Sequence, residues 1–501
     1  MPRYVLVNRR AGMFTNDAKL ASRAAVATSL GLLRNIRVVE DRDPKDEFAR
    51  RVVLLDADAA DIAAIHAKLP PDAVLEAAVQ RHLHHRMPIE LRPTLPFATS
   101  TAAARRSAYE VIVTGNGKPL SSIDVLFYVR DPGRQIRTAT VQTDNEGRAR
   151  LAIPPGYLLA FVEPIPYSSF WIMLAEAPPS GSTIDCLPIA KAGPDGEAWW
   201  HRVMGIGNTQ GRGAGIKVGV IDTGCGPHPN LAHVQLVGTF VDGQVLPAAE
   251  ATDVAEHGSH TTGIIGARPT KPGDYGGMAP NCELFHARVF KGEGEGDGPT
   301  QADLINAIDA LSRDTGCDLI NMSLGGGPPS QAEEDAIRDA TERGTLCICS
   351  AGNAAGPVDY PGAYPECVAV SAIGQVGWAP AGTFSAGNRP RQADLMGHDN
   401  LFLATFSCFG DNLACAAPGV GIISTVPDKA GDTDLYMEMD GTSMASPAAC
   451  GVLAAILSKD ATYPGMPRDL SRTTAARHLL GKHCEPFGLA VKYEGRGLPH
   501  T

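Results

Sequence analysis

From Trp199 onward, short apolar segments with the character of buried strands alternate with segments of helical periodicity. The apolar segments span residues 217–221, 284–289, 319–322, 346–349 and 367–372, and the helical ones include 302–314 and 332–343. Strands that are apolar along their whole length and separated by helices are typical of parallel sheets buried on both faces. The sequence therefore predicts a three-layer α/β domain, and we expect its chemistry at the carboxyl ends of the strands.

Length and composition limit what else the chain can be. It has 501 residues, which at roughly 100 to 200 residues per domain corresponds to about three domains. It is 44% hydrophobic and 20% charged, which is ordinary for a globular protein. The formal net charge of −11 argues against a nucleic-acid partner, because affinity for phosphates depends largely on clustered lysines and arginines.

The first 92 residues predict a small α+β domain. Strand-like segments lie near residues 4–7, 36–39, 52–55 and 74–79, with one helix expected over 17–31. A second helix carries Ile62, Ile65 and Leu69 along one side, the spacing of an apolar stripe. The order βαββαβ predicts a ferredoxin-like domain over residues 1–92, and the proline-rich, basic stretch at 81–96 reads as a linker.

Residues 105–176 have a different period. Ile123, Val125, Phe127 and Val129 alternate with polar positions, and a turn signal at 143–147 separates this run from the next alternating one. The pattern predicts a small antiparallel β-sandwich. A second linker is expected over about 177–197, so that the α/β domain occupies 199–501.

Three segments of the α/β domain carry side chains that could act together. Asp222 stands at the tip of a buried strand, His257 opens a helix, and Ser443 stands at the start of an apolar helix. Each alone is common, since such residues often cap helices or form turns. Jointly they supply the nucleophile, the base and the orienting carboxylate that serine catalysis requires.

The order of these segments and their local sequences resemble the subtilisin-like serine peptidases, the subtilase family, over about residues 199–501. The resemblance implies a serine endopeptidase in which Ser443 attacks the scissile carbonyl, His257 transfers the proton and Asp222 orients His257. The run Ser-Ala-Gly-Asn ending at Asn353 resembles the family's oxyanion-hole motif, so Asn353 is expected to stabilise the oxyanion.

The resemblance extends to substrate binding. The segment with Ser323, Leu324 and Gly325 is similar to the family's strand that pairs with the substrate backbone. The stretch 360–365 resembles a wall of the pocket for the residue before the scissile bond. Asp359 precedes it, and two interpretations stay open: a pocket carboxylate that favours lysine or arginine, or a solvated loop acid.

Two segments depart from the family pattern, the first only by Ser259, where the family usually has threonine. Residues 446–450 read Ser-Pro-Ala-Ala-Cys where the family usually has a Thr-Pro-His-Val-Ala type of run. A histidine that is common behind the nucleophile is therefore absent. None of the groups that the reaction uses is lost, so we expect activity to survive.

The two domains before residue 199 also have family counterparts. The N-terminal domain resembles the subtilase propeptide, which implies an intramolecular inhibitor whose extension near residues 79–87 lies in the cleft like a substrate. The sandwich resembles carboxypeptidase-regulatory-like modules, which mostly bind or stabilise. Autocleavage in the linkers at 81–107 or 176–198 is a hypothesis that follows.

No organic cofactor is expected. Family members often bind structural calcium, but no loop here is distinctive enough for ligands to be assigned. His82, His84 and His85 form a small cluster, which is either a set of solvated linker histidines or a metal site. The glycine-rich run 211–217 precedes a strand and lacks a following serine or threonine, so it is not a nucleotide-binding loop.

The sequence predicts a cytoplasmic protein, because no apolar segment of signal-peptide length follows the N-terminal arginines and no membrane span is found. All eleven cysteines follow residue 185 and are expected to be reduced, with a Cys408–Cys415 disulfide as the alternative.

Two other functions stay open beside the endopeptidase, which would act on a protein or peptide substrate. They are a catalytically silent binding scaffold and an esterase or amidase that uses the same triad.

Overall fold

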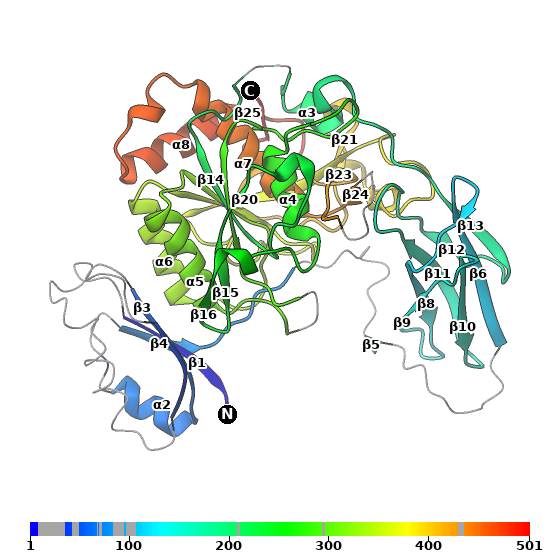
Figure 1. Ribbon diagram of the computed structural model, residues 1–501, viewed down its shortest axis with the longest axis horizontal. Coiled ribbons are helices and arrows are strands. Elements are labelled where there is room, and N and C mark those ends of the chain that lie inside the picture. The colour runs from blue at the N-terminus through cyan, green and yellow to red at the C-terminus, as the bar shows by residue number, and fades with distance from the viewer. Residues whose placement is uncertain are drawn as a thin grey trace.

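The computed structural model describes residues 1–8, 36–42, 50–67, 69, 73–83, 95–96, 107–207, 211–292, 296–428 and 435–501. Within these ranges the chain forms a large α/β domain, an N-terminal sheet and a pair of smaller sheets (Figure 1). The helix that the sequence predicts over 17–31 lies outside the described residues.

The α/β domain is built on a nine-stranded sheet with the order β16-β15-β17-β14-β18-β19-β20-β21, in which β22 also pairs with β20. The pairs that join β15, β17, β14, β18, β19, β20 and β22 are parallel, and β16 and β21 are added antiparallel. The strands are β14 (Lys217–Asp222), β15 (Gln235–Val241), β16 (Gln244–Leu246), β17 (Glu283–Arg288), β18 (Leu319–Met322), β19 (Leu346–Ser350), β20 (Cys367–Gln375), β21 (Leu401–Leu403) and β22 (Leu413–Pro418).

Helices cover both faces of this sheet, which confirms the predicted three-layer α/β architecture. One face carries α4 (His257–Gly266) and α7 (Thr442–Lys459), and the other carries α5 (Gln301–Asp309) and α6 (Gln331–Glu342). A π-helical segment, Ala310–Asp314, follows α5 directly.

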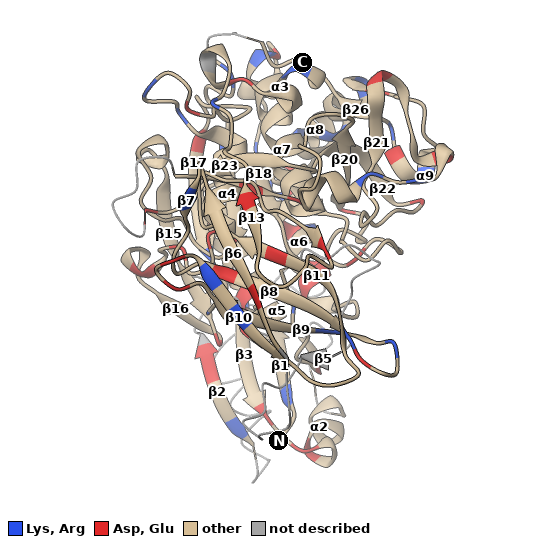
Figure 2. Cartoon of the chain, turned by 90° about the vertical axis from the view of Figure 1, so that its right-hand side faces the viewer, with Lys and Arg blue, Asp and Glu red and all other residues tan. Residues whose placement is uncertain are grey.

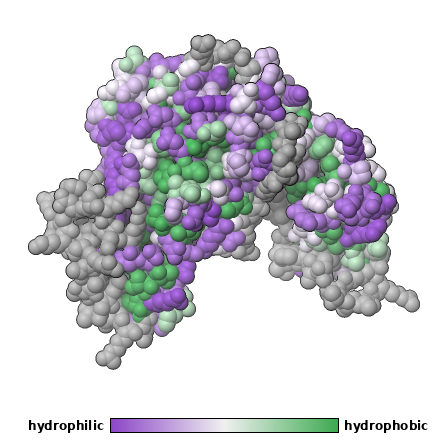
Figure 3. Space-filling model, in the orientation of Figure 1, coloured by the Kyte–Doolittle hydropathy of each residue, from purple (hydrophilic) through white to green (hydrophobic). Residues whose placement is uncertain are grey.

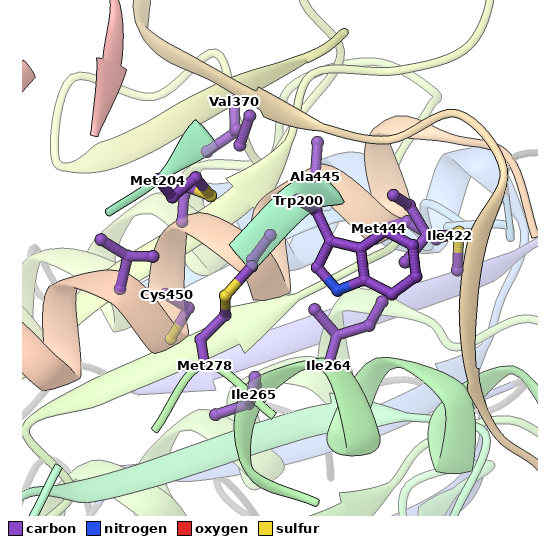
Figure 4. Packing of buried hydrophobic residues seen from close by; sticks show 14 of the residues in the cluster. Trp200, Met204, Ile264, Ile265, Met278, Val370, Ile422, Met444, Ala445 and Cys450 are labelled. Carbon is purple, nitrogen blue, oxygen red and sulfur yellow. The ribbon is translucent and has the colours of Figure 1, made fainter. Parts of the chain in front are cut away.

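The core on the α4 and α7 side is closed by aromatic and sulfur-containing side chains. Trp200 packs there beside Ile264 of α4 and Met444 of α7 (Figure 4). Helix α7 is buried from Thr442 to Leu457, so it has no solvent-exposed polar face over that length. The remaining elements of the domain are α3 (Trp199–Val203), α8 (Leu470–Lys482), α9 (Val491–Glu494), β23 (Ile422–Thr425) paired with β24 (Tyr436–Met439), and β25 (Cys484–Glu485) paired with β26 (Leu498–Pro499).

The N-terminal sheet has four antiparallel strands in the order β2-β3-β1-β4. They are β1 (Arg3–Asn8), β2 (Arg37–Arg42), β3 (Arg51–Asp56) and β4 (Ala73–Ala77), and α2 (Ala59–His66) follows β3. In Figure 1 this sheet lies below the α/β domain, on the side of α5 and α6.

Both faces of the N-terminal sheet are apolar, because successive side chains of a strand point to opposite faces. Leu6, Val53 and Leu55 pack with Ile65 of α2. The residues of the other face, Val5, Val7, Val52 and Leu54, belong to the apolar cluster that contains α5 and α6. The sheet therefore buries its second face against the α/β domain.

The middle region consists of two sheets with a shared apolar core. One has the order β10-β6-β13 with β7 also paired to β6, and the other has the order β12-β11-β8-β9-β5. The strands are β5 (Leu95–Pro96), β6 (Ser107–Gly115), β7 (Lys118–Pro119), β8 (Asp124–Arg130), β9 (Ile136–Gln142), β10 (Arg148–Ile153), β11 (Leu158–Ile165), β12 (Ala175–Glu176) and β13 (Ser182–Cys186).

Strand β13 differs from the sequence prediction, which placed a linker over about 177–197. It pairs in parallel with β6, and Ile184 and Cys186 point into the core of the two sheets. A five-residue strand whose partner lies about 70 residues earlier gives no local hairpin signal. The segment before β13 packs into the α/β domain. Trp171 and Ile172 are buried there, and Ser169 donates its backbone N–H to the Tyr436 carbonyl at 3.0 Å.

Charged side chains of both signs lie on the middle region, and the cysteines are unpaired thiols. Figure 2 shows acidic and basic residues interspersed on the middle region, where Glu110 accepts hydrogen bonds from Arg148 at 2.8 Å and Arg150 at 2.5 Å. The described residues include every cysteine, and no disulfide forms between them, so the Cys408–Cys415 bond is not made.

Hydrophilic residues dominate the upper part of the molecule in Figure 3, and hydrophobic residues show mainly towards its centre. No helix in the described ranges has the length and apolar character that a bilayer crossing requires.

Candidate active site

Asp222 ends the central strand β14 and is fully buried. One carboxylate oxygen accepts hydrogen bonds from the Thr223 backbone N–H and from His257 Nδ1, both at 2.7 Å. The other oxygen accepts from the Thr261 hydroxyl at 3.1 Å. A buried carboxylate needs such donors to offset its lost hydration, and here they also fix the direction in which it faces His257.

His257 is the first residue of α4, and the turn before it is held by the carboxylate of Asp253. That carboxylate accepts from the backbone N–H groups of Ala255 at 3.0 Å and Ser259 at 2.7 Å, and from the Thr223 hydroxyl at 2.7 Å. Burial raises the pKa of Asp253 above its ordinary value, and the hydrogen bonds oppose that shift. Asp253 thereby positions the residues on either side of His257.

Ser443 lies in the first turn of α7 and is 2% exposed. Its hydroxyl donates to the backbone carbonyl of Ser323 at 3.2 Å. Among the described residues no hydrogen bond joins this hydroxyl to His257, although α4 and α7 pack against each other. The structure therefore joins Asp222 directly to His257, and Ser443 to Ser323, which directly follows β18.

Asn353 follows β19 and approaches the start of α7. Its Oδ1 accepts from the Thr442 backbone N–H and from the Thr442 hydroxyl, each at 2.9 Å. These bonds orient the amide, because only the oxygen can accept from an N–H donor. A Cβ atom placed on Gly441 would lie 3.1 Å from Asn353 Nδ2 and 3.5 Å from the Ser443 backbone nitrogen. Two N–H donors therefore border one small space beside Ser443.

A polar cluster that the sequence analysis did not identify lies behind Ser443. The Ser323 hydroxyl donates to the Ser443 carbonyl at 2.8 Å and lies 3.0 Å from the Ser446 hydroxyl. Asn321 Nδ2 donates to the same Ser323 oxygen at 3.0 Å. The only sequence signal was Ser446 itself, in the second of the segments that depart from the family pattern.

The segment from Val79 to Leu83 lies against the extended segment that contains Gly325. His82 and Gly325 exchange both backbone hydrogen bonds, at 2.9 and 3.0 Å, as in an antiparallel pair. On the other side, Arg81 donates its backbone N–H to Pro299 at 2.9 Å. The N-terminal region thus inserts an extended segment between two backbone segments of the α/β domain and forms a bridge to each of them.

The model of the subtilase family matches residues 213–486. The chain belongs to the subtilase family. The match falls within the α/β domain, which is therefore the subtilase domain of this chain, as the sequence predicted.

Several curated subtilases are similar to this one. An alkaline protease of Alkalihalobacillus alcalophilus is 33% identical over 252 residues, which is 50% of this chain and 56% of the relative. Subtilisin DY of Bacillus licheniformis is 33% identical over 295 residues, 57% of this chain and 89% of the relative. The major intracellular serine protease of Bacillus subtilis is 31% identical over 296 residues, 57% and 81% respectively. The chain therefore spans little more than half the length of the first of these relatives.

Asp359 of this subtilase is half-buried and lies against Ala351 and Gly352, which precede Asn353 in the chain. Its backbone N–H donates to the Ala351 carbonyl at 2.9 Å, and its carboxylate lies beside Gly352. The adjacent Tyr360 accepts the Gly326 backbone N–H at 3.0 Å, so this loop touches the segment that follows Gly325.

His286 is a second buried histidine near Asp222. It lies in β17 opposite Val220, accepts the Gly224 N–H at 3.2 Å through Nε2, and lies 3.0 Å from the Thr262 hydroxyl through Nδ1. Burial lowers its pKa to about 4, and the nearby charge of Asp222 opposes that shift. The only sequence signal was a polar residue inside an apolar strand.

A metal site is not evident in the described ranges, where no three His, Cys, Asp or Glu side chains come together in a way that could hold an ion. Of the histidine cluster near residue 82, His84 and His85 lie outside the described residues.

Proposed function

We propose that this subtilase is a serine endopeptidase in which Ser443, His257, Asp222 and Asn353 act together. The observation that carries the proposal is the pair of N–H donors beside Ser443, contributed by Asn353 Nδ2 and the Ser443 backbone. Donors held in place beside a nucleophile stabilise the charge that develops on the carbonyl oxygen in the transition state. The Asp222–His257 hydrogen bond supplies the oriented base.

Acylation begins when the Ser443 hydroxyl turns from the Ser323 carbonyl to His257 Nε2, a rotation between staggered rotamers. Nε2 takes the hydroxyl proton as Oγ bonds to the substrate carbonyl carbon. The tetrahedral oxyanion then accepts from Asn353 and the Ser443 N–H. As the C–N bond breaks, the imidazolium returns the proton to the leaving amine, and Asp222 stabilises the imidazolium throughout.

Deacylation repeats the same steps with water as the nucleophile. His257 accepts a proton from water as the hydroxide oxygen bonds to the acyl carbon, and then returns it to Ser443 Oγ as the ester bond breaks. Apart from the substrate and this water, these steps use only side chains and backbone groups of the chain. No organic cofactor enters the proposal, and structural calcium stays without assigned ligands.

The substrate we propose is an extended peptide or protein segment that pairs with Ser323, Leu324 and Gly325. The backbone exchange between His82 and Gly325 supports this mode, because an extended segment already pairs with Gly325 there; we call this backbone at Ser323–Gly325 the pairing edge. Asp359 is proposed to favour lysine or arginine before the scissile bond. Its support is the location of its carboxylate next to Gly352, the residue that precedes Asn353 in the chain.

The N-terminal domain, over residues 1–92, is proposed to be a ferredoxin-like intramolecular inhibitor. Two observations support this: residues 79–83 occupy the pairing edge that a substrate would use, and the second face of the N-terminal sheet is buried against α5 and α6. The sandwich, over 105–176 and extended by β13, is proposed to stabilise the chain or bind a partner. The segment with Trp171 supports the stabilising role.

A cytoplasmic location is proposed as well. Its support is the similarity to proteins named as intracellular serine proteases, from Bacillus subtilis and Paenibacillus polymyxa. An active peptidase in that compartment would need control, which an attached inhibitor would supply.

The decisive experiment compares the chain with its Ser443→Ala variant for hydrolysis of quenched fluorescent peptides and for labelling by a fluorophosphonate probe. Hydrolysis and labelling that are both lost in the variant are expected. If the chain is not labelled, and is still neither labelled nor active on peptides after Glu76→Ala has weakened the contact of the N-terminal domain, it is a catalytically silent scaffold. Cleavage of esters without cleavage of any peptide would indicate an esterase or amidase.

Self-processing is tested separately by intact mass. We expect the wild-type chain to be cut within 81–107 or 176–198, and the Ser443→Ala chain to stay whole. Equal intact masses after prolonged incubation would argue against autocleavage.

A further inference from the structure

The side chain of Arg81 is fully enclosed beside the pairing edge of the α/β domain. Its Nε donates to Glu333 Oε1 at 3.2 Å and its Nη2 donates to Glu333 Oε2, which makes a two-pronged contact. Its Nη1 donates to the backbone carbonyls of Gly326 and of Pro328, the latter at 2.9 Å. One carboxylate and two carbonyls thus surround the planar guanidinium, and this geometry suits arginine better than lysine.

Glu333 is itself built into the pocket. It is fully buried near the start of α6, and its backbone N–H donates to the Ser330 side chain at 3.1 Å. The Tyr364 hydroxyl donates to Glu333 Oε2 at 2.9 Å. Burial, and then the charge of Glu333, raise the pKa of Tyr364, which keeps it a neutral donor. Removal of Arg81 would leave this buried carboxylate without a cation, a costly state that favours another guanidinium in its place.

A peptide bound at the pairing edge could reach the same pocket that Arg81 of the N-terminal domain fills. His82 exchanges backbone bonds with Gly325 and is exposed, whereas the preceding Arg81 is buried, the alternation of a strand. An extended peptide that pairs with Gly325 in the same way would direct the residue before its paired residue towards Glu333.

Arg50 is a second buried arginine that joins the N-terminal region to α6, and its hydrogen bonds can be compared with those of Arg81. Arg50 also forms a buried ion pair with α6, through Asp339. Within the described residues, however, Nε and Nη1 of Arg50 are buried without a hydrogen-bond partner. All nitrogens of Arg81 have acceptors, so the pocket around Arg81 matches a guanidinium much more closely.

We propose that the pocket formed by Glu333, Tyr364 and the Gly326 and Pro328 carbonyls is a substrate subsite for arginine. It selects peptides that carry arginine one residue before the residue that pairs with Gly325. The N-terminal segment occupies the subsite by offering Arg81 in the same manner. This inference rests on the proposed peptidase function and is separate from the preference assigned to Asp359.

Binding is measured in the full-length chain with two substitutions: Ser443→Ala to prevent cleavage and Arg81→Ala to empty the pocket. A labelled peptide with the sequence of residues 78–84, Ala-Val-Gln-Arg-His-Leu-His, is compared with one that has citrulline, a neutral near-isostere, in place of arginine. The tethered segment competes with both peptides alike, so the ratio of their apparent Kd values is unaffected. We expect the arginine peptide to bind at least about 30-fold more tightly.

Two further substitutions test the assignment to Glu333. Glu333→Gln in the same chain is expected to bring the two peptides within about threefold of each other. Glu334→Gln is the matched control, because Glu334 is the next residue of α6 and pairs with Arg338 at 3.1 Å; it should leave the ratio unchanged.

Equal affinity for the two peptides in the chain with intact Glu333, or binding of neither at millimolar concentration, would overturn the proposal. That comparison leaves the pocket intact, so it is decisive even if Glu333→Gln fails to fold. Binding requires no hydrolysis. A chain that prefers arginine but never cleaves a peptide would therefore contradict the peptidase function and not the subsite.

Discussion

The carboxylate of Glu76 in β4 accepts the backbone N–H of Gln331, the first residue of α6, at 3.0 Å. The same carboxylate accepts from the Ala332 N–H at 3.3 Å and from the Ser330 hydroxyl. The first N–H groups of a helix have no intrahelical acceptor, and its N-terminus favours negative charge. The N-terminal sheet therefore contributes a cap to a helix that borders the proposed active site.

We predict that Glu76→Ala loosens the N-terminal domain and activates the chain. The loss of a charged cap costs about 1–2 kcal/mol, which would raise the fraction of chains with an open cleft about 5- to 30-fold. The initial rate of hydrolysis of a quenched peptide measures this fraction. Asp58→Asn is the control, since Asp58 is exposed and makes no side-chain cap bond to α2; it should leave the rate unchanged. If the Glu76→Ala variant hydrolyses the peptide no faster than wild type, the inhibitory role of the N-terminal domain is contradicted.

Asn353→Asp should lower kcat about 100- to 1000-fold with little change in KM, because removal of one oxyanion donor acts mainly on the transition state. The aspartate keeps an oxygen to accept the two hydrogen bonds from Thr442, so the start of α7 is preserved. Steady-state kinetics on one peptide gives both constants. A variant with nearly normal kcat would remove Asn353 from the mechanism, and an unchanged melting temperature would show that the loss is not due to unfolding.

The strands and helices that carry the proposed machinery were predictable because their signals are local. The apolar run that ends at Asp222 has the pattern of a buried parallel strand. In the structure this run is β14, which lies inside the sheet with the Asp222 carboxylate at its end. Asn353 likewise follows β19 directly. Family resemblance then connected positions that the pattern alone left separate.

Other features depend on partners far away in the sequence. Arg81 and Glu333 are 252 residues apart, and nothing near Arg81 distinguishes it from the other basic residues of the predicted linker. Strand β13 was missed for the same reason, since its pairing with β6 crosses the whole middle region. Periodicity reports which face of an element is buried, but not which distant group completes a buried ion pair or a sheet edge.

Asp359→Asn should selectively weaken cleavage after basic residues. Asp359 is half-buried, so we expect a loss of about tenfold in kcat/KM for peptides with arginine before the scissile bond, the cost of a partly screened charge pair. Peptides with leucine at that position should change by less than about threefold. Cleavage of paired Arg and Leu peptides measures the ratio. If wild type already prefers Leu, or if both peptides change equally, Asp359 is the solvated loop acid.

The buried His286 should make the native fold less stable in mild acid. Its native pKa is about 4, against an ordinary value near 6.5 in the unfolded chain. Between these values the unfolded state binds a proton that the native state does not, so stability is full above about pH 6.5 and falls as the pH drops towards 4. For this one group the loss of stability between pH 7 and pH 5 is about 2 kcal/mol.

Urea unfolding of wild type and His286→Gln at both pH values measures this loss. The variant should be less stable at pH 7, because the bonds to Gly224 and Thr262 are altered, yet should lose about 2 kcal/mol less on acidification. His66→Gln, on the exposed end of α2, should keep the wild-type pH dependence. An identical acid loss in His286→Gln and wild type would mean that His286 is not held neutral by burial.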